Sequence, residues 1–391
     1  MAEHTYRYLV VGGGLAGDGV VQGIRDVDQT GTIGLVGAEQ HAPYSRPPLS
    51  KGLWSGGDES KISRGTEEKG ATLHLGRRIV SLDLDAHTAR DDAGDTYRFE
   101  KLLLTTGGEP RRLGGDDGEV VYFRTLDDFR KLRERAQEGA HVVVIGGGFI
   151  GSEIAASVAS TGARVTMLFP EAGIGARNFP ADLSQFVTDY FREKGVDVQA
   201  GVMVGKVEGN TVTLQDGRTF EGDAVVAGLG IVPNGELAQD AGLPVENGIV
   251  VDEYGRVGGR DDVYAAGDVA MFPASALGRP IRIEHEDHAK SHGRAVGANA
   301  AGAGKPYDHL PFFYSDLFDL GYEAVGEVDS RHDTLAYWKE PNREGVVAFV
   351  DGERRPRGFL LWNVWDKVDD ATELIRRGEP IDESALKQLA G

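Results

Sequence analysis

Residues 7–17 read RYLVVGGGLAG, and residues 141–151 read HVVVIGGGFIG. Each stretch is a short aliphatic, strand-like run that ends in G-x-G-x-x-G and precedes a helix-compatible segment. In such a unit the first glycine allows a tight turn, the second lets a pyrophosphate approach the backbone, and the third lets the helix pack closely. These glycines are Gly12, Gly14 and Gly17 in the first copy and Gly146, Gly148 and Gly151 in the second.

Both copies continue in the same way, which a chance glycine-rich loop would not do. Each is followed by a second strand-like run and then by an acidic residue, Glu39 in the first copy and Glu171 in the second. Each acid lies about 20 residues beyond the third glycine, where a carboxylate can bind the ribose hydroxyl groups of an adenosine. The sequence therefore predicts two nucleotide-binding units in one chain.

The similarity between the two halves extends further downstream, as expected for an internal duplication. Each half has a polar hairpin-like segment and then an apolar strand ending in glycine and proline, LLLTTGGEP at 102–110 and VVAGLGIVP at 225–233. We expect Thr105, Gly107 and Gly230, at these strand ends, to bind the cofactors. Two nucleotide sites suggest an electron donor and a bound acceptor, as in a flavoprotein that uses a nicotinamide nucleotide.

A further strand end is present in VYAAGDVA at 263–270. It places Gly267 and Asp268 where a strand meets a helix, so the carboxylate could accept hydrogen bonds from a ribityl chain. A plain helix N-cap is the alternative reading of Asp268.

Taken together, the GGG turn, LLLTTGG and AAGD resemble the two-dinucleotide flavoprotein reductases. Residues 41–54, HAPYSRPPLSKGLW, and residues 282–289, RIEHEDHA, are similar to signatures of ferredoxin reductases and apoptosis-inducing-factor-type proteins. FFYSDLFDLGYEAVG at 312–326 and GFLLWNVW at 358–365 resemble the latter more closely. Tyr314 is a departure, because both subfamilies have tryptophan there. The long polar insertion and targeting region of the mitochondrial protein are also absent, so its cell-death roles are not expected.

This resemblance, which covers nearly the whole chain, implies an α/β fold. It has two Rossmann-like dinucleotide-binding domains and a C-terminal α+β interface domain. We expect an FAD-binding domain over 1–112 and 242–308, an NAD-binding domain over 113–241, and a C-terminal cap over 309–391. The first glycine unit, with Glu39 and Asp268, would bind FAD, and the second, with Glu171, would bind NAD(H).

The same resemblance gives roles to residues outside the glycine motifs. Lys51 would donate a hydrogen bond to flavin N5, and Glu153, two residues after the second motif, would pair with it. The alternatives are a solvent-exposed lysine and a first-turn acid that stabilises the helix dipole. Arg46 would contact phosphate or flavin, or else lie on a surface loop. Further expected flavin contacts are Glu284, His285 and Tyr314, with a purely structural role for His285 left open.

Composition limits the chemistry. Cysteine is absent, which excludes a dithiol relay and thiolate metal sites, and no metal site is expected. The formal net charge of −20, from 62 acidic and 42 basic residues, disfavours nucleic acid or an anionic membrane as a partner. No signal peptide or apolar run of membrane-spanning length is recognised, so we expect a cytoplasmic protein.

The predicted function is that of an FAD-dependent NADH oxidoreductase, in which hydride passes from NADH to flavin N5 and electrons then leave to an external acceptor. NADH is favoured because Glu171 would repel a 2′-phosphate, although Arg177 keeps NADPH open. The acceptor could be oxygen, a quinone or an iron–sulfur protein, and we expect a homodimer that forms either constitutively or in response to NADH.

Two alternatives remain. The first is a ferredoxin reductase of an oxygenase or cytochrome P450 system, which would need a local basic patch. The candidate arginines for that patch are Arg282, Arg294, Arg354, Arg355 and Arg357. The second is a redox-responsive interaction protein whose oligomeric state follows reduction of FAD.

Overall fold

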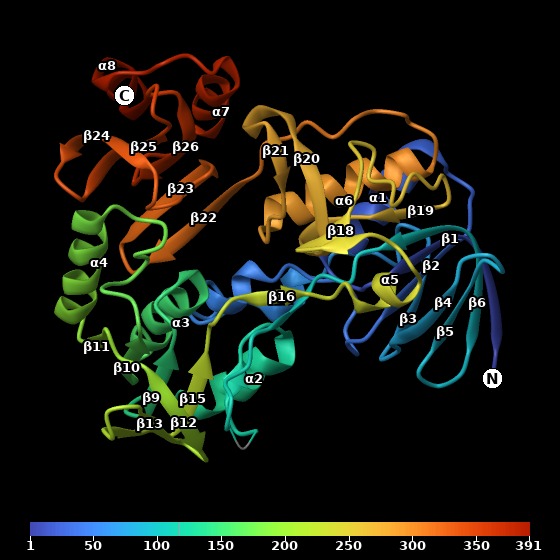
Figure 1. Ribbon diagram of the computed structural model, residues 1–391. Coiled ribbons are helices and arrows are strands. Elements are labelled where there is room, and N and C mark those ends of the chain that lie inside the picture. Colours follow the sequence, from blue (N-terminus) through green and yellow to red (C-terminus); the bar gives the residue numbers. More distant parts are fainter. Residues whose placement is uncertain (117) are drawn as a thin grey trace. The chain divides into compact units, whose positions relative to one another are not determined.

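The computed structural model describes residues 1–116 and 118–391, which form two compact units (Figure 1). Unit 1 comprises Met1–Ser45, Glu59–Glu109 and Val232–Pro311. Unit 2 comprises Arg46–Asp58, Pro110–Ile231 and Phe312–Gly391. The chain passes between the units along β7 (Gly108–Pro110) and β16 (Ile231–Pro233), which pair with each other.

Unit 1 contains a seven-stranded sheet in the order β3-β2-β1-β6-β5-β4, with β19 paired to β6. The strands are β1 (Glu3–Val11), β2 (Ile33–Gly37), β3 (Ala71–Leu75), β4 (Ile79–Asp83), β5 (Thr88–Asp91), β6 (Thr96–Leu104) and β19 (Val263–Ala265). β1 pairs with β2 and β6 in parallel, whereas β4, β5 and β6 pair antiparallel. All five residues of β2 are buried, as in a parallel strand covered on both faces.

Two helices of unit 1, α1 (Leu15–Val27) and α6 (Glu286–Ala300), pack closely against each other. Glycines make this approach possible. A Cβ atom at Gly23 would lie 1.9 Å from the Arg294 carbonyl oxygen, and one at Gly297 would lie 2.2 Å from that of Val20. The first glycine loop is thus attached to a rigid pair of helices.

The rest of unit 1 is built from short elements. A four-stranded sheet contains β17 (Val245–Glu246), β18 (Gly248–Val250), β20 (Ala270–Ala274) and β21 (Arg279–Ile281). The other elements are α5 (Glu236–Asp240), η2 (Glu59–Ile62), η3 (Gly267–Val269) and η4 (Ser275–Leu277). One residue separates η3 from β19, and η4 follows β20 directly.

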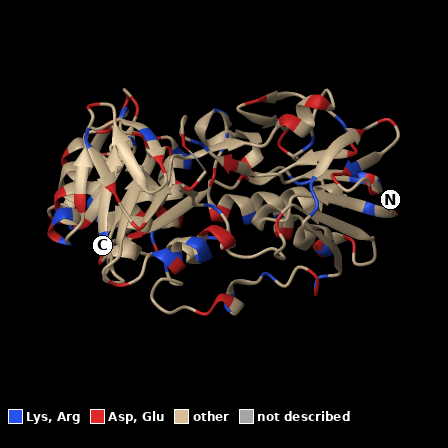
Figure 2. Cartoon of the chain, turned by 90° about the horizontal axis from the view of Figure 1, so that it is seen from below, with Lys and Arg blue, Asp and Glu red and all other residues tan. Residues whose placement is uncertain are grey.

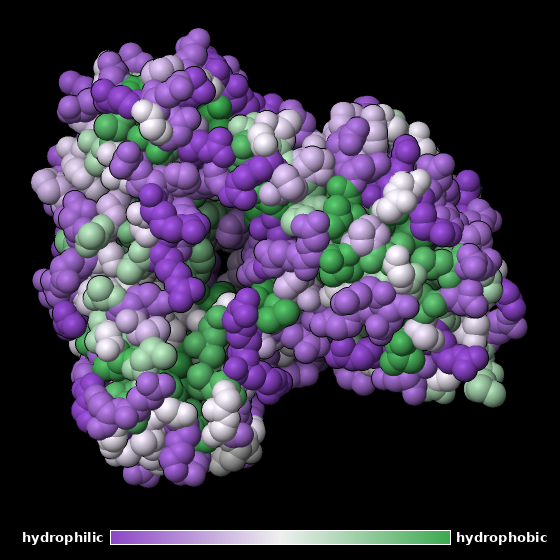
Figure 3. Space-filling view, in the orientation of Figure 1, coloured by the Kyte–Doolittle hydropathy of each residue, from purple (hydrophilic) through white to green (hydrophobic). Residues whose placement is uncertain are grey.

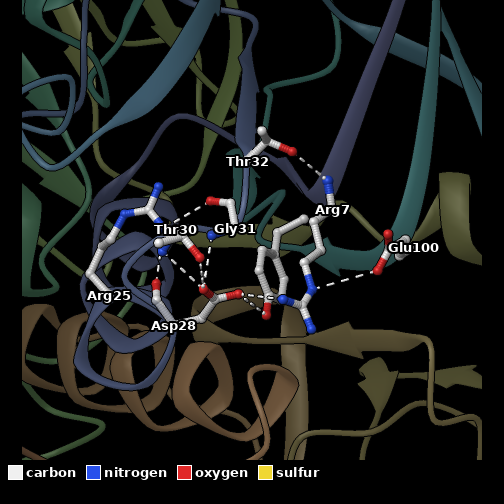
Figure 4. A network of polar contacts seen from close by, with 8 residues as sticks. Arg7, Arg25, Asp28, Thr30, Gly31, Thr32 and Glu100 are labelled. Atoms are coloured by element: carbon white, nitrogen blue, oxygen red, sulfur yellow. Dashed lines mark hydrogen bonds and ion pairs between the residues drawn. The ribbon is translucent and has the colours of Figure 1, made fainter.

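The turn between α1 and β2 is held by Asp28 (Figure 4). Its carboxylate accepts hydrogen bonds from the backbone N–H groups of Thr30 and Gly31, at 3.0 and 2.8 Å, and pairs with Arg7 at 2.8 Å. These contacts hold the pKa of Asp28 well below its usual range. Burial, together with the hydrogen bond to the same carboxylate, raises the pKa of Tyr8 to about 12.

A buried carboxylate also ties α1 to the segment that leads into β3. Asp18 is fully buried and accepts a hydrogen bond from Thr66 Oγ1 at 2.7 Å. It pairs with Arg64 Nε at 3.1 Å and with Lys69 Nζ at 2.6 Å. Because a buried carboxylate is costly unless it is paired and hydrogen-bonded, these partners fix the first turn of α1 after the glycine loop.

Unit 2 repeats the plan with a five-stranded parallel sheet in the order β11-β10-β9-β15-β8. The strands are β8 (Val121–Tyr122), β9 (His141–Ile145), β10 (Arg164–Phe169), β11 (Asp197–Ala200) and β15 (Ala224–Ala227). The helices are α2 (Leu126–Arg135), α3 (Phe149–Ala159) and α4 (Ala181–Glu193). A three-stranded antiparallel sheet consists of β12 (Val204–Glu208), β13 (Thr211–Leu214) and β14 (Thr219–Glu221). Both glycine motifs therefore lie between a parallel strand and a helix, as predicted.

The C-terminal part of unit 2 is an antiparallel sheet in the order β22-β23-β26-β25-β24. Its strands are β22 (Phe312–Leu317), β23 (Leu320–Gly326), β24 (Asp333–Glu340), β25 (Glu344–Val350) and β26 (Pro356–Trp362). The helices α7 (Val368–Arg377) and α8 (Glu383–Ala390) pack on it. Unit 2 also includes the short helix η1 (Pro47–Ser50), far away in sequence.

The surface is that of an acidic protein. Figure 2 shows Asp and Glu spread over helices and loops throughout the chain, with Lys and Arg interspersed among them. In Figure 3 hydrophilic residues dominate the face drawn, and hydrophobic residues reach it in scattered groups. Among the described residues, no helix combines the length and apolar character that crossing a membrane requires.

Candidate functional site

The first glycine loop connects β1 to α1 in unit 1. Gly12 has φ +123°, and a Cβ atom there would lie 2.1 Å from the Thr105 carbonyl oxygen. A Cβ atom at Gly17 would lie 2.2 Å from the Gly12 carbonyl oxygen. At Gly14, in contrast, φ is −97° and a Cβ atom would have no neighbour within 4 Å. Packing within the protein accounts for Gly12 and Gly17, whereas Gly14 leaves open backbone of the kind that a pyrophosphate approaches.

The second loop, between β9 and α3 in unit 2, divides its glycines in the same way. Gly146 has φ +121° and its Cβ atom would lie 2.4 Å from the Gly228 carbonyl oxygen, while that of Gly151 would lie 2.1 Å from the Gly146 carbonyl oxygen. Gly148 has φ −86° and open space where a Cβ atom would be. Both loops thus fit the diphosphate of a dinucleotide at a helix N-terminus.

Three further predicted residues follow strands of unit 1. Thr105, after β6, donates a hydrogen bond from Oγ1 to the Gly12 carbonyl oxygen at 3.0 Å. Glu39, after β2, accepts a hydrogen bond from the Tyr44 hydroxyl at 2.6 Å. Gly107 has φ +64° and lies two residues after Thr105. The structure therefore joins Thr105 to the first loop.

The predicted residues of the 267–285 region lie together in unit 1. Gly267 and Asp268 begin η3, which Ala266 separates from β19, so the predicted strand end is followed by a 3-10 turn. Arg282 donates from Nη1 to the Asp268 carbonyl oxygen at 3.1 Å and pairs with Glu284 at 2.7 Å. His285 is the N-cap residue of α6, and burial lowers its pKa to about 4.

In unit 2 the structure brings together Lys51, Glu153 and Tyr314. Lys51 follows η1, and its Nζ atom forms an ion pair with Glu153 Oε1 on the first turns of α3. The same Nζ atom lies 5.3 Å from the centre of the Tyr314 ring and 3.9 Å from Asp316 Oδ2. The side chains of Lys51 and Glu153 are 13% and 7% exposed, so the pair is largely withdrawn from water.

The sequence reasoning missed two partners of Glu153. Ser50 Oγ donates to Glu153 Oε2 at 2.6 Å, and Ser315 Oγ donates to Glu153 Oε1 at 2.6 Å. Both serines stand inside quoted motifs, beside Lys51 in RPPLSK and beside Tyr314 in FFYSD. Their position in those motifs was the available signal, but it does not show where a hydroxyl points.

Three other predicted residues have contacts of their own in unit 2. Arg46 precedes η1, and its Nη1 atom donates to the Arg124 carbonyl oxygen at 2.6 Å. Glu171, after β10, pairs with Arg177 Nη2 at 2.6 Å. Gly230 has φ +78°, and its carbonyl oxygen accepts a hydrogen bond from the Arg111 N–H at 2.9 Å.

Behind η3, unit 1 contains a buried pair of histidines on α6. His288 and His292 have ring centres 4.8 Å apart and pack against Phe272. His292 Nδ1 accepts a hydrogen bond from the Gly267 N–H at 3.3 Å. Burial lowers the pKa of His288 well below its ordinary value and that of His292 to about 3. Both rings are therefore neutral over the physiological range.

This burial predicts acid sensitivity of the fold. In the unfolded chain a histidine titrates near 6.5, whereas folded His292 stays neutral to about pH 3. The contribution of each such neutral histidine to the free energy of unfolding is fully present above pH 6.5. As the pH falls below 6.5 towards the folded pKa, this contribution declines by about 1.4 kcal/mol per pH unit. Urea unfolding at several pH values between 7 and 5 measures the slope. His292→Asn should reduce it, and an unchanged slope in that variant would contradict the prediction.

Two dinucleotide-type loops, one in each unit, together with a buried Lys–Glu pair define a pyridine-nucleotide flavoprotein reductase. Residues 6–293 match the family model for pyridine nucleotide-disulphide oxidoreductase. Residues 296–354 match that for the C-terminal domain of mitochondrion-associated apoptosis-inducing factor. The chain belongs to the pyridine nucleotide-disulphide oxidoreductase family.

Individual relatives agree with this assignment. Apoptosis-inducing factor 1, mitochondrial, of Dictyostelium discoideum is 32% identical, over 98% of this chain and 80% of the relative. Monodehydroascorbate reductase 1, peroxisomal, of Arabidopsis thaliana is 36% identical, over 97% and 98%. The solved structure of the ferredoxin reductase for the CYP199A2 system from Rhodopseudomonas palustris has a TM-score of 0.89 and 30% identity, over 99% of this chain and 100% of that one.

These findings confirm the predicted resemblance and the α/β fold class. They also confirm a flavoprotein oxidoreductase that uses FAD and NAD(H).

Proposed function

We propose that this chain oxidises NADH through bound FAD and passes the electrons directly to an external acceptor. The observation that carries the proposal is the buried ion pair between Lys51 and Glu153. Glu153 lies two residues after the last glycine of the second motif. The absence of cysteine supports the second half of the proposal, because a dithiol cannot take up the electrons in this chain. An acceptor from outside must do so.

The residues present would hold the cofactors as follows. The Gly14 loop with Glu39, Thr105 and Asp268 would hold FAD, and the Gly148 loop with Glu171 would hold NADH. When bound, FAD supplies a group that accepts hydride and later releases electrons.

The chain's own contribution is orientation and charge. Lys51 would donate a hydrogen bond at flavin N5, and Glu153 keeps the ammonium group oriented. Because the pair is shielded from water, this interaction is stronger than it would be at the surface. Arg46, Gly107, Gly230, Gly267, Glu284, His285 and Tyr314 are included in the proposal as further cofactor contacts.

The ferredoxin alternative finds support in several similar proteins and opposition in the charges. One structural neighbour and one relative are named ferredoxin reductases, and another neighbour is a putidaredoxin reductase in complex with putidaredoxin. Four of the five candidate arginines, however, pair with carboxylates: Arg282 with Glu284, Arg294 with Asp26, Arg355 with Glu353, and Arg357 with Glu327. A small acceptor, such as a quinone, oxygen or an organic radical, is therefore favoured over an acidic protein.

The proposal also covers the domain division, the oligomeric state and the cellular location. We retain the three-domain division, with FAD domain 1–112 and 242–308, NAD domain 113–241 and cap 309–391, together with a homodimer formed through the cap and a cytoplasmic location. Size-exclusion chromatography with and without NADH separates a constitutive dimer from one that follows reduction. A change of oligomer accompanied by slow turnover would favour the redox-responsive interaction protein instead.

One experiment tests the proposed function. The FAD-loaded protein is titrated anaerobically with NADH, and the reduced protein is then mixed with oxygen, a quinone, ferricyanide, monodehydroascorbate or a ferredoxin. We expect stoichiometric flavin reduction and rapid reoxidation by one of the small acceptors. Flavin that NADH cannot reduce would overturn the proposal, and reoxidation by ferredoxin alone would favour the ferredoxin reductase.

The preference for NADH gives a separate prediction. Glu171→Gln removes the charge that would repel a 2′-phosphate and frees Arg177 to bind it. We expect kcat/KM for NADPH to rise roughly tenfold relative to that for NADH, which corresponds to about 1.4 kcal/mol. Steady-state kinetics with both nucleotides measures the ratio. Glu193→Gln, at an exposed position on α4, is the matched control and should leave the ratio unchanged.

A further inference from the structure

The Glu153 carboxylate has a donor on each oxygen besides the lysine it was expected to bind. Oε2 accepts from Ser50 Oγ and Oε1 from Ser315 Oγ, both at 2.6 Å, and Oε1 also receives Lys51 Nζ. Counted over the whole residue, Ser50 is 3% exposed, Ser315 is 1% exposed and Glu153 is 6% exposed. In such a dry environment each hydrogen bond fixes the carboxylate strongly, because water cannot replace a lost donor.

The two serines come from elements that are themselves anchored. Ser50 ends η1, and its carbonyl oxygen accepts a hydrogen bond from Ser157 Oγ on α3 at 2.6 Å. Ser315 lies on β22 opposite Tyr322 of β23, and the ring of Tyr322 stacks on Trp362 at 5.4 Å. The carboxylate is therefore held from the helix side by η1 and from the sheet side by β22.

Lys51 has an alternative partner close by. Asp316 Oδ2 lies 3.9 Å from Lys51 Nζ, and its side chain is 54% exposed. A Glu153 carboxylate that rotated would lose its alignment with the ammonium group, which could then turn towards Asp316. The hydrogen bonds from the two serines, one to each oxygen of Glu153, oppose such a rotation.

We propose that Ser50 and Ser315 are positioning residues that lock the Glu153 carboxylate and thereby aim the Lys51 ammonium group. This inference rests on the proposed role of the Lys51–Glu153 pair in flavin reduction. It makes the C-terminal sheet a part of the reductive machinery, because β22 supplies one of the two hydroxyl groups.

The test uses Ser50→Ala and Ser315→Ala in the FAD-loaded protein. Misplacing a reacting group by about 1 Å can cost up to about 100-fold in rate, so we expect flavin reduction by NADH to slow about tenfold in each variant. NAD⁺ affinity should stay within about twofold, because neither serine belongs to the glycine loop. The flavin midpoint potential should fall, since a poorly aimed ammonium group stabilises the negatively charged reduced flavin less. Ser315→Thr, which keeps the hydroxyl, should restore the rate.

Thr166→Val is the matched control, because it removes a buried hydroxyl of β10 that bonds His141 and not Glu153. It should leave the rate and the potential unchanged. In a Lys51→Ala background the serine substitutions should have no further effect. Wild-type rate and potential in both serine variants would overturn the inference. A wild-type rate in Lys51→Ala would reject the role of Lys51 on which the inference rests, whereas flavin that NADH cannot reduce in the unmutated protein would overturn the proposed function.

Discussion

Flavin reduction by NADH is expected to be about 100-fold slower in a Lys51→Ala variant than in the wild-type protein, because loss of one preorganised donor at a reacting centre costs about 10²–10³ in rate. Anaerobic stopped-flow measurement of flavin absorbance gives this rate directly. NADH affinity should change little, since Lys51 lies outside the Gly148 loop.

The size of this effect follows from the burial of the pair. Lys51 and Glu153 are 13% and 7% exposed, and removal of the lysine leaves a carboxylate whose hydrogen bonds, within the described part of the chain, come from the two serine hydroxyls. The folded state should also be destabilised, because an uncompensated buried charge is costly. Stability of the variant must therefore be measured beside its rate, and the rate is read only under conditions where the variant is fully folded.

Lys194→Ala is the control for loss of a paired lysine. Lys194 pairs with Asp319 in the same unit, but it is 38% exposed and is the C-cap residue of α4. NADH should reduce the flavin of Lys194→Ala as fast as that of the wild-type protein. If Lys51→Ala were equally fast, the role of Lys51 at flavin N5 would be rejected, whatever the fate of its ion pair.

The glycine loops could be predicted from sequence because their chemistry is local. Gly12, Gly14 and Gly17 lie within six residues of one another, and a strand before them and a helix after them are visible as patterns. Local patterns could not predict the Lys51–Glu153 pair, because the two residues lie 102 positions apart. The resemblance to known motifs linked them.

The serine contacts could not be predicted in the same way. Ser50, Glu153 and Ser315 meet only once η1, α3 and β22 have packed, and a motif specifies residue types but not the direction of a hydroxyl. The burial of the two histidines on α6 could not be predicted for a related reason. EDHAKSH reads as a polar helix start, yet His288 and His292 are covered by Phe272 and Tyr307 from outside the helix. Tertiary packing decided both cases.

The second large effect is expected at Gly14 and Gly148, where the backbone conformation suits any residue and a Cβ atom would meet none of the described residues within 4 Å. Gly14→Ala should fold normally, because its φ of −97° suits alanine and the new methyl group meets no atom within 4 Å. That methyl would occupy the space into which the FAD pyrophosphate must fit. Since a methyl group forced into a packed contact costs about 1–3 kcal/mol, FAD affinity should fall about 10- to 100-fold.

Gly148→Ala should give the complementary result. Its φ is −86° and its Cβ atom is equally free, so the protein should keep its stability and its FAD. NADH binding alone should weaken, by a similar factor. Flavin content after dialysis and nucleotide titration of the loaded protein measure the two affinities. The assignment of FAD to the first loop and NADH to the second predicts this crossed pattern, and the reversed pattern would require the assignment to be exchanged.

Two further substitutions separate ligand contact from backbone strain. Gly12→Ala should fail to give stable protein, since φ is +123° and the methyl group would lie 2.1 Å from the Thr105 carbonyl oxygen. Gly352→Ala, in a turn where a Cβ atom meets nothing within 4 Å, should be silent. If Gly14→Ala behaved like Gly352→Ala and kept full FAD affinity, the open backbone at Gly14 would not be a pyrophosphate site. If it behaved like Gly12→Ala, the glycine would serve the fold and not the cofactor.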